Sequence, residues 1–204
     1  MKTTGKPTKD IASALGIPEA ELSPRAREVI AGLTAEIGHL RARLESLETV
    51  ADQDSLLPIL NRRAFVREMA RIMAFAERYD LTTSLVYFDL DSLKAINDTD
   101  GHAAGDAALR HVAGLIAGNV RKSDIVGRLG GDEFGVILPK ADQPLADKKA
   151  RALAKLLAAH PFLWQGKMRS LTVAYGVHTF AKSDDPESAI AAADKAMYAA
   201  KRAK

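Results

Sequence analysis

The feature that most constrains the fold is a glycine pair followed by two acids, Gly130-Gly131-Asp132-Glu133-Phe134. Residues 125–129 before it and 134–138 after it are largely apolar, which is typical of two neighbouring strands. The glycines provide the backbone freedom that a tight turn requires. The pattern therefore predicts a β-hairpin with two carboxylates at its tip. By itself it fits a solvated turn about as well as a binding site, because acidic residues are common in turns.

A second acidic position lies at the end of a strand-like run. Residues 85–91 read Leu-Val-Tyr-Phe-Asp-Leu-Asp, and their β-branched and aromatic content favours a mostly buried strand. A buried carboxylate without a partner is costly, so Asp89 is expected to face a cation. Asp91, where the run ends, is expected only to cap the following turn.

The order of elements predicts an α/β (α+β) fold with a mainly antiparallel central sheet flanked by helices. Hydrophobic periodicity predicts helices from residue 60, near 103–120, near 145–159 and from 186, and strands near 83–90 and 170–178 on either side of the hairpin. Asn61 and Asp185 are expected to cap the first and last of these helices.

From the first strand onward, this order is β-α-β-β-α-β, that of the ferredoxin-like split βαβ fold. In that fold the first two strands run parallel with the third between them. The hairpin turn then lies at the carboxyl end of the first strand, which brings Asp132 close to Asp89. Two carboxylates at one edge suit Mg²⁺ (or Mn²⁺) bound together with substrate phosphates.

Six motifs in order carry a resemblance to a known family. They are Asp54-x-Leu56, Asn61-Arg62-Arg63-x-Phe65, Asp89-Leu90-Asp91-Ser92-Leu93-Lys94-x-Ile96-Asn97-Asp98, Gly101-His102-x-x-Gly105-Asp106, Arg128-x-Gly130-Gly131-Asp132-Glu133-Phe134 and Ala193-Asp194-x-Ala196-Met197-Tyr198-x-Ala200-Lys201. In this order and spacing, residues 54–201 resemble a GGDEF domain, the catalytic domain of diguanylate cyclases. The resemblance implies the palm fold of nucleotidyl cyclases and a bacterial signalling enzyme that condenses two GTP molecules into cyclic di-GMP and pyrophosphate.

The resemblance also implies roles for individual residues. The metal ligands would be Asp89, the carbonyl of Leu90, Asp132 and Glu133, and Glu133 would alternatively assist deprotonation of the ribose 3′-hydroxyl. Asn97 and Asp106 would recognise the guanine edge. The phosphates would meet Lys94, Lys201 and the backbone around Leu93, although Leu93 stands where the family usually has Phe.

A second nucleotide site is implied by the segment before the hairpin. Arg121-Lys122-Ser123-Asp124 ends five residues before Gly130 and resembles the Arg-x-x-Asp motif through which the family's product inhibits the enzyme. An arginine can bind a phosphate or a guanine edge through its planar fork, and an aspartate can accept from guanine nitrogens. The expected ligand of Arg121 and Asp124 is cyclic di-GMP.

The N-terminal part of the chain predicts a coiled-coil helix over residues 23–53. Apolar residues follow the three-four spacing of a heptad seam: Ile30, Leu33, Ile37, Leu40, Leu44, Leu47 and Ala51. Flanking charges such as Glu36 and Arg41 would pair across a parallel homodimer formed through residues 30–51. The alternative is an amphipathic helix packed on its own domain. A dimer would suit the implied chemistry, because a symmetric product needs two half-sites that face each other.

The remaining expectations concern organisation and partners. Residues 1–22 are expected to be a short segment that is mobile or binds an upstream regulatory protein, and residues 54–204 the catalytic domain. The chain has 204 residues, no cysteine, no long apolar run and a net charge of +3, which favours a cytoplasmic protein without a membrane or nucleic-acid partner. The alternative to an active enzyme is a weak or inactive receptor that binds GTP or cyclic di-GMP and signals through its coiled coil.

Overall fold

The computed structural model describes residues 22–202, except for the side chains of 44–50, and divides into two units. The first ends at Ala51, and its described part is one helix, α2 (Pro24–Asp52), which continues to the first residue of the second unit. Ser23 caps α2, since its hydroxyl accepts from the Ala26 amide at 3.2 Å. The predicted segment 1–22 lies outside the described residues apart from Leu22. No described helix is long and apolar enough to cross a membrane.

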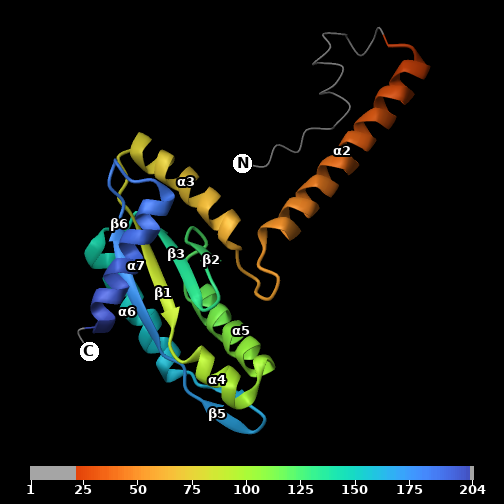
Figure 1. The fold of residues 1–204 in the computed structure, drawn as a ribbon. Helices are drawn as coiled ribbons and strands as arrows, with labels where there is room; N and C mark the ends of the chain where they lie inside the picture. Colours follow the sequence, from red (N-terminus) through yellow and green to blue (C-terminus); the bar gives the residue numbers. More distant parts are fainter. Residues whose placement is uncertain (1–21, 203–204) are drawn as a thin grey trace. The chain divides into compact units, whose positions relative to one another are not determined.

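The second unit is built on a four-stranded sheet, and its topology confirms the predicted fold class. The strands are β1 (Thr83–Leu90), β2 (Ile125–Arg128), β3 (Glu133–Pro139) and β6 (Val173–Thr179), in the order β2-β3-β1-β6. Every neighbouring pair is antiparallel, so β1 and β2 run parallel with β3 between them. The turn between β2 and β3 therefore lies at the carboxyl end of β1 (Figure 1).

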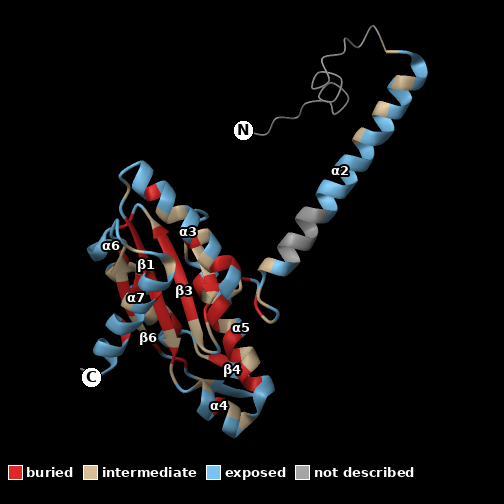
Figure 2. Ribbon diagram, turned by 45° about the horizontal axis from the view of Figure 1, so that its top comes forward, coloured by how far each residue is buried: buried red, intermediate tan, exposed pale blue. Residues whose placement is uncertain are grey.

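Helices cover both faces of the sheet, whose strands are largely buried (Figure 2). The alternation of side chains along β1 separates two cores. Leu85 and Tyr87 face α3 (Arg62–Arg78) and α7 (Pro186–Arg202). On the other face, Val86, Phe88 and Leu90 pack against α5 (His102–Gly118) and α6 (Gln143–Ala159). Asp89 continues the alternation of the first set, which directs it toward the α3 and α7 face.

The two expected caps are confirmed, and each begins a helix that covers the acidic face. The Asn61 side chain accepts from the Ala64 amide at 3.0 Å at the start of α3. Asp185 accepts from the Ser188 amide at 2.7 Å, and Pro186 is the first residue of α7. Both local sequences satisfy backbone amides that the first helical turn would leave without partners.

Two elements were missed by the sequence expectations. Residues 93–100 form the helix α4 (Leu93–Asp100), for which no element was predicted, and a small hairpin comprises β4 (Phe162–Trp164) and β5 (Lys167–Arg169). The strand expected near 170–178 starts three residues later, at Val173. The physical reason is length: eight or three residues with few apolar positions carry no readable period, and contacts with the rest of the domain stabilise them.

Candidate active site

The acidic turn and the end of β1 meet through the backbone. Asp89 pairs directly with Glu133 in the β1–β3 register. Beyond this pair, the Leu90 amide donates to the Asp132 carbonyl at 2.9 Å. The predicted convergence of Asp89 and Asp132 is thus present in the backbone of the structure, because antiparallel pairing places the start of β3 beside the end of β1.

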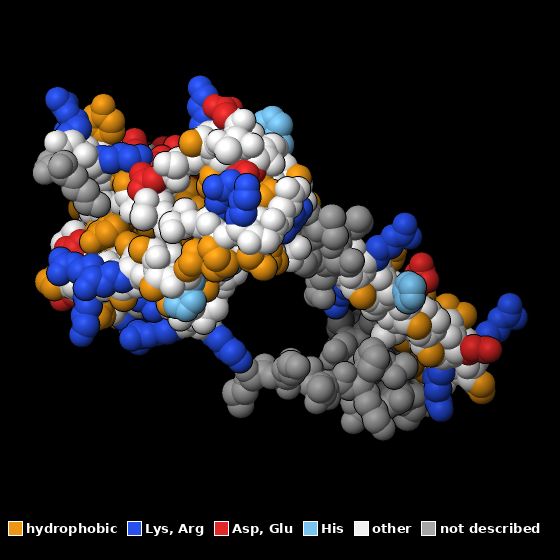
Figure 3. All heavy atoms as spheres, turned by 90° about the horizontal axis from the view of Figure 1, so that it is seen from below, with side chains coloured by type: hydrophobic (Ala, Val, Ile, Leu, Met, Phe, Trp, Pro, Cys, Tyr) orange, Lys and Arg blue, Asp and Glu red, His pale blue; other side chains and the backbone are white. Residues whose placement is uncertain are grey.

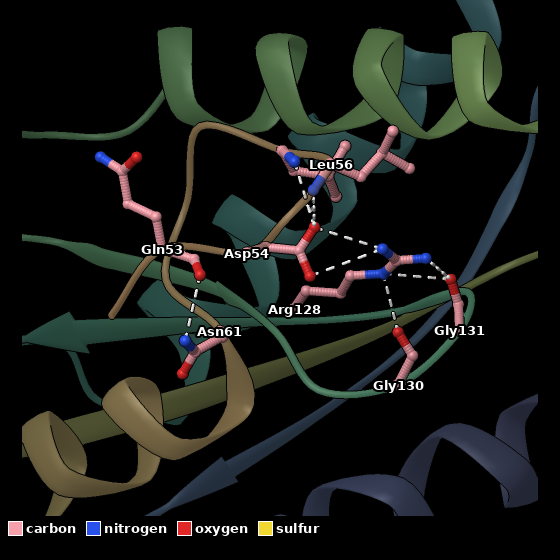
Figure 4. Close-up of polar contacts among 8 residues, drawn as sticks. Gln53, Asp54, Leu56, Asn61, Arg128, Gly130 and Gly131 are labelled. Atoms are coloured by element: carbon pink, nitrogen blue, oxygen red, sulfur yellow. Dashed lines mark hydrogen bonds and ion pairs between the residues drawn. The ribbon is translucent and has the colours of Figure 1, made fainter. Parts of the chain in front are cut away.

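The turn is held from inside by one arginine (Figure 4). The Arg128 guanidinium donates to the Gly130 carbonyl at 2.9 Å and to the Gly131 carbonyl at 2.6 Å. It also forms an ion pair with Asp54 at 3.2 Å, and the two side chains are only 18% and 14% exposed. These contacts occupy the carbonyls of both glycines, which fixes the backbone just before Asp132 and Glu133.

Asp54 links the turn to the first residues of the domain. Its Oδ1 accepts from the amides of Leu56 and Leu57 at 3.0 and 3.1 Å, in addition to its contact with Arg128. Residues 54–60 also contact the edge strand β2. The Leu60 amide donates to the Val126 carbonyl, and the Leu60 carbonyl accepts from the Arg128 amide. The first residues of the domain are therefore linked to the acidic turn through Arg128.

Glu133 lies in a confined environment. A Cβ atom on Gly130 would lie 2.0 Å from Glu133 Oε2, so the carboxylate packs closely against the turn. On the other side, burial and then the interaction with the Glu133 carboxylate raise the pKa of the Tyr87 phenol far above its ordinary range. Tyr87 thus stays protonated and can donate to Glu133.

A lysine from α7 supplies positive charge to this site. Lys201 Nζ contacts Asp89 Oδ1 at 2.5 Å and Asp91 Oδ1 at 3.3 Å. The hydrogen bond to Asp89 is the main cause that raises the pKa of the Lys201 ammonium. The expectation that Asp91 only caps a turn is wrong: its carboxylate also accepts from the Thr172 hydroxyl at 2.9 Å, and it shares Lys201 with Asp89.

The donor set at the end of β1 fits a divalent cation. Carboxylate and carbonyl oxygens are the ligands that Mg²⁺ prefers, and the Lys201 ammonium shows that Asp89 already engages a positive charge. Among the side chains that the structure describes, no three acidic, histidine or cysteine groups lie together as a preformed cluster. A cation held by Asp89, Asp132 and Glu133 would therefore need rotation of their side chains or oxygens from a substrate.

Apart from Lys201 on α7, the residues assigned to guanine and phosphates lie on α4 and α5, the two helices that follow β1. Lys94 is exposed on α4, where Leu93 is the first residue. Asn97 lies on the same helix and packs against α5, because a Cβ atom on Gly105 would lie 2.0 Å from Asn97 Oδ1. Asp106, the residue after Gly105, is half-buried. The fold thus brings the helix of Asn97 to the helix segment of Asp106.

The Arg121 to Asp124 segment forms a compact turn before β2. Asp124 Oδ2 accepts from the Arg121 amide at 2.9 Å, and the Asp124 amide donates to the Arg121 carbonyl. The Arg121 residue is exposed, and both residues line a small cavity of about 60 Å³. The motif therefore presents an accessible arginine next to a fixed carboxylate.

Three residues that support the acidic site received no role from the sequence: Asp54, Tyr87 and Arg128. A signal for Tyr87 existed, because strand alternation places it on the face of Asp89. The roles of Asp54 and Arg128 depend on an ion pair between residues 74 positions apart, which no local pattern reveals.

Known proteins resemble this chain over most of its length. The diguanylate cyclase TpbB of Pseudomonas aeruginosa is 35% identical over 194 residues, covering 91% of this chain and 45% of TpbB. The probable diguanylate cyclase DgcE of Escherichia coli is 33% identical over 168 residues, covering 81% of this chain and 15% of DgcE. The chain therefore spans less than half the length of these relatives.

A solved structure resembles both the fold and its N-terminal extension. The coiled coil and GGDEF domain of DgcB from Caulobacter crescentus, in complex with c-di-GMP, matches with a TM-score of 0.78 at 30% identity, covering 86% of this chain and 94% of DgcB's. The family model described as "Diguanylate cyclase, GGDEF domain" matches residues 51–204. With its acidic turn at the end of β1 and its antiparallel four-stranded sheet, the chain belongs to the GGDEF family.

Proposed function

We propose that this protein is a diguanylate cyclase that condenses two GTP molecules into cyclic di-GMP and pyrophosphate. The observation that carries the proposal is the meeting of Asp132 and Glu133 with Asp89 at the end of β1, where Lys201 adds a cation. Anionic oxygens and a fixed cation at one edge suit phosphoryl-type chemistry, in which charge develops on phosphate oxygens. Relatives that are named diguanylate cyclases support the same reaction.

Each GTP would be oriented by groups outside the acidic turn. Asn97 and Asp106 bind the guanine edge, offering an amide and a carboxylate that adenine does not match. Lys94 and Lys201 bind phosphates, and the backbone around Leu93 lies against them. The Glu133 carboxylate, which packs against the turn, accepts the proton of the ribose 3′-hydroxyl or serves as a metal ligand.

A divalent cation, Mg²⁺ or Mn²⁺, would be held by Asp89, the Leu90 carbonyl, Asp132 and Glu133. When bound, it supplies positive charge that stabilises the reacting phosphate and the leaving pyrophosphate. Lys201 contacts Asp89 in the structure, so this lysine is placed to transfer its contact from the carboxylate to a substrate phosphate.

The catalytic unit of the proposal is a homodimer. Residues 23–53 provide the dimer contact and 54–204 the catalytic domain, and each domain contributes one half-site with one GTP. The exposed apolar positions of α2, together with the coiled coil in the matching DgcB structure, support this arrangement. Cyclic di-GMP binding at Arg121 and Asp124 would provide product inhibition.

Product formation tests the proposal directly. Purified protein incubated with GTP and Mg²⁺ is expected to form cyclic di-GMP, and Asp132→Ala is expected to abolish it, since a proposed metal ligand is lost. Glu77→Gln, an exposed acid on α3, is the matched control and should retain full activity. Absence of product over a wide range of enzyme concentrations, with retained nucleotide binding, would instead favour the receptor that signals through its coiled coil.

A further inference from the structure

The helix α4 carries Asn97 but has few anchors of its own. It contains eight residues, of which only Ile96 is buried. Ser92 before it has a positive φ of 64° and makes no side-chain capping bond, and Gly101 after it has a φ of 82°. A helix this short is marginal in isolation, so contacts with other elements must determine where its side chains lie.

One such contact comes from the β4–β5 hairpin. Arg169 on β5 donates from Nη2 to Asp100 Oδ1 at 2.6 Å, and the two side chains are 31% and 16% exposed. Asp100 lies three residues after Asn97, so both project from one side of α4. The Arg169 Nε atom is buried without a hydrogen-bond partner among the described residues, so the side-chain contact of this partly exposed guanidinium is the one with Asp100.

The same hairpin also contacts α5, the helix of Asp106. Phe162 on β4 is buried, and its ring centroid lies 6.1 Å from that of His111 on α5. Just before β4, the His160 carbonyl lies 2.8 Å from His111 Nε2. The hairpin thus touches both helices that carry the proposed guanine-binding residues, at the end of the domain where α4 and β5 lie in Figure 1. Figure 3 views the molecule from below and shows basic and acidic side chains beside one another on that face.

We propose that the β4–β5 hairpin acts as a clamp that sets the position of Asn97 relative to Asp106, with Arg169 and Asp100 as positioning residues. This inference rests on the proposed function, because it assumes that Asn97 and Asp106 bind guanine. Loss of the ion pair frees the end of α4, while the acidic turn keeps its own contacts with Arg128. Affinity for guanine falls, whereas binding of a nucleotide that uses only the phosphate contacts does not.

Binding of non-cyclising analogues tests the clamp. Affinities for 3′-deoxy-GTP and 3′-deoxy-ATP with Mg²⁺ are measured by calorimetry for the full chain and for Arg169→Met and Asp100→Asn. Both variants are expected to bind 3′-deoxy-GTP about three- to tenfold more weakly, the effect of losing roughly one partly exposed ion pair, with 3′-deoxy-ATP unchanged. Lys167→Met, an exposed lysine on the same strand, is the control and should match the wild type.

The two variants separate positioning from direct electrostatics. Arg169→Met removes a positive charge and Asp100→Asn a negative one, so a direct effect on the anionic nucleotide would weaken one and strengthen the other. Weakening of both supports the clamp, and the charge swap Asp100→Arg with Arg169→Asp should restore part of the affinity. Opposite changes, or no change in either variant, would overturn it.

Amide hydrogen exchange without nucleotide provides a readout that does not depend on the proposed function. The amides of residues 93–100 are expected to exchange faster in Arg169→Met than in the wild type, while those of β1 and β3 are unchanged. A wild type that binds neither analogue would contradict the proposed function, and the exchange result would still decide the clamp. Equal exchange in residues 93–100 would refute it.

Discussion

At the scale of single residues, the acidic turn depends on Arg128, which has no proposed role in binding or catalysis. Arg128 satisfies the carbonyls of Gly130 and Gly131, and Asp54 balances its charge in a poorly exposed position. Removing one partner of such a pair is costly, because it leaves the other charge and two carbonyls without compensation. The positions of the Asp132 and Glu133 carboxylates therefore depend on Arg128 and Asp54, which lie outside residues 130–134.

Substitution of this pair should lower both stability and activity. Arg128→Met is expected to reduce the free energy of unfolding by about 2 kcal/mol and to slow formation of cyclic di-GMP. Asp54→Asn should cost less than Asp54→Ala, because the amide oxygen can still accept from Leu56 and Leu57. Urea unfolding and product formation are the measurements, with the exposed Arg110→Met as control. Unchanged product formation in Arg128→Met would show that the turn does not need this arginine.

At the scale of elements, the position of Lys201 depends on how closely α7 approaches the sheet. Gly176 on β6 has no side chain at the crossing point: a Cβ atom there would lie 2.1 Å from the Ala193 carbonyl oxygen and 2.3 Å from the Met197 nitrogen. These are backbone atoms of α7, which cannot move separately from the helix. The close approach allows Lys201, four residues after Met197, to reach Asp89.

Gly176→Ala should therefore displace α7. We expect the variant to lose about 2 kcal/mol of unfolding free energy through overpacking, and to bind GTP more weakly because Lys201 moves away from the site. Gly114→Ala is the control, since nothing lies within 4 Å of its added Cβ on an exposed helix position. Thermal unfolding and calorimetric GTP binding would check both. A stable Gly176→Ala with normal affinity would show that the crossing tolerates a methyl group.

At the scale of the whole molecule, one domain holds only half of the proposed reaction. The helix α2 has exposed apolar residues at its seam, with Leu33 55%, Leu40 52% and Ile37 41% exposed. Large apolar side chains repeated on one side of a helix are typical of a surface that another helix covers. Joining two domains raises the effective concentration of one half-site around the other.

Disrupting the seam should separate binding from turnover. The double variant Leu33→Asp with Leu40→Asp is expected to sediment as a monomer and to lose at least about tenfold of its activity at low protein concentration, while GTP affinity per chain stays the same. Ala35→Asp adds a charge outside the seam and should remain dimeric. If the double variant is monomeric and fully active at every concentration, the two-half-site proposal is wrong.

Local residue patterns were sufficient to predict much of this molecule. Periodicity and caps predicted the longer helices, and strand order alone brought Asp89 and Asp132 together, because antiparallel pairing leaves little choice of where a short hairpin turn lies. Such patterns depend on neighbours in the chain, which the sequence shows directly.

The features that the sequence did not predict depend on contacts between residues that are far apart in the chain. The helix α4 and the β4–β5 hairpin are too short to carry a period, and their contact joins Asp100 and Arg169, which are 69 positions apart. Lys201 and Asp89 are 112 positions apart, and their contact requires the packing of α7 on Gly176. Such pairs form only when the sheet and helices have packed together. The sequence by itself therefore predicted the acidic turn, whereas only the tertiary structure identified the residues that hold it in place.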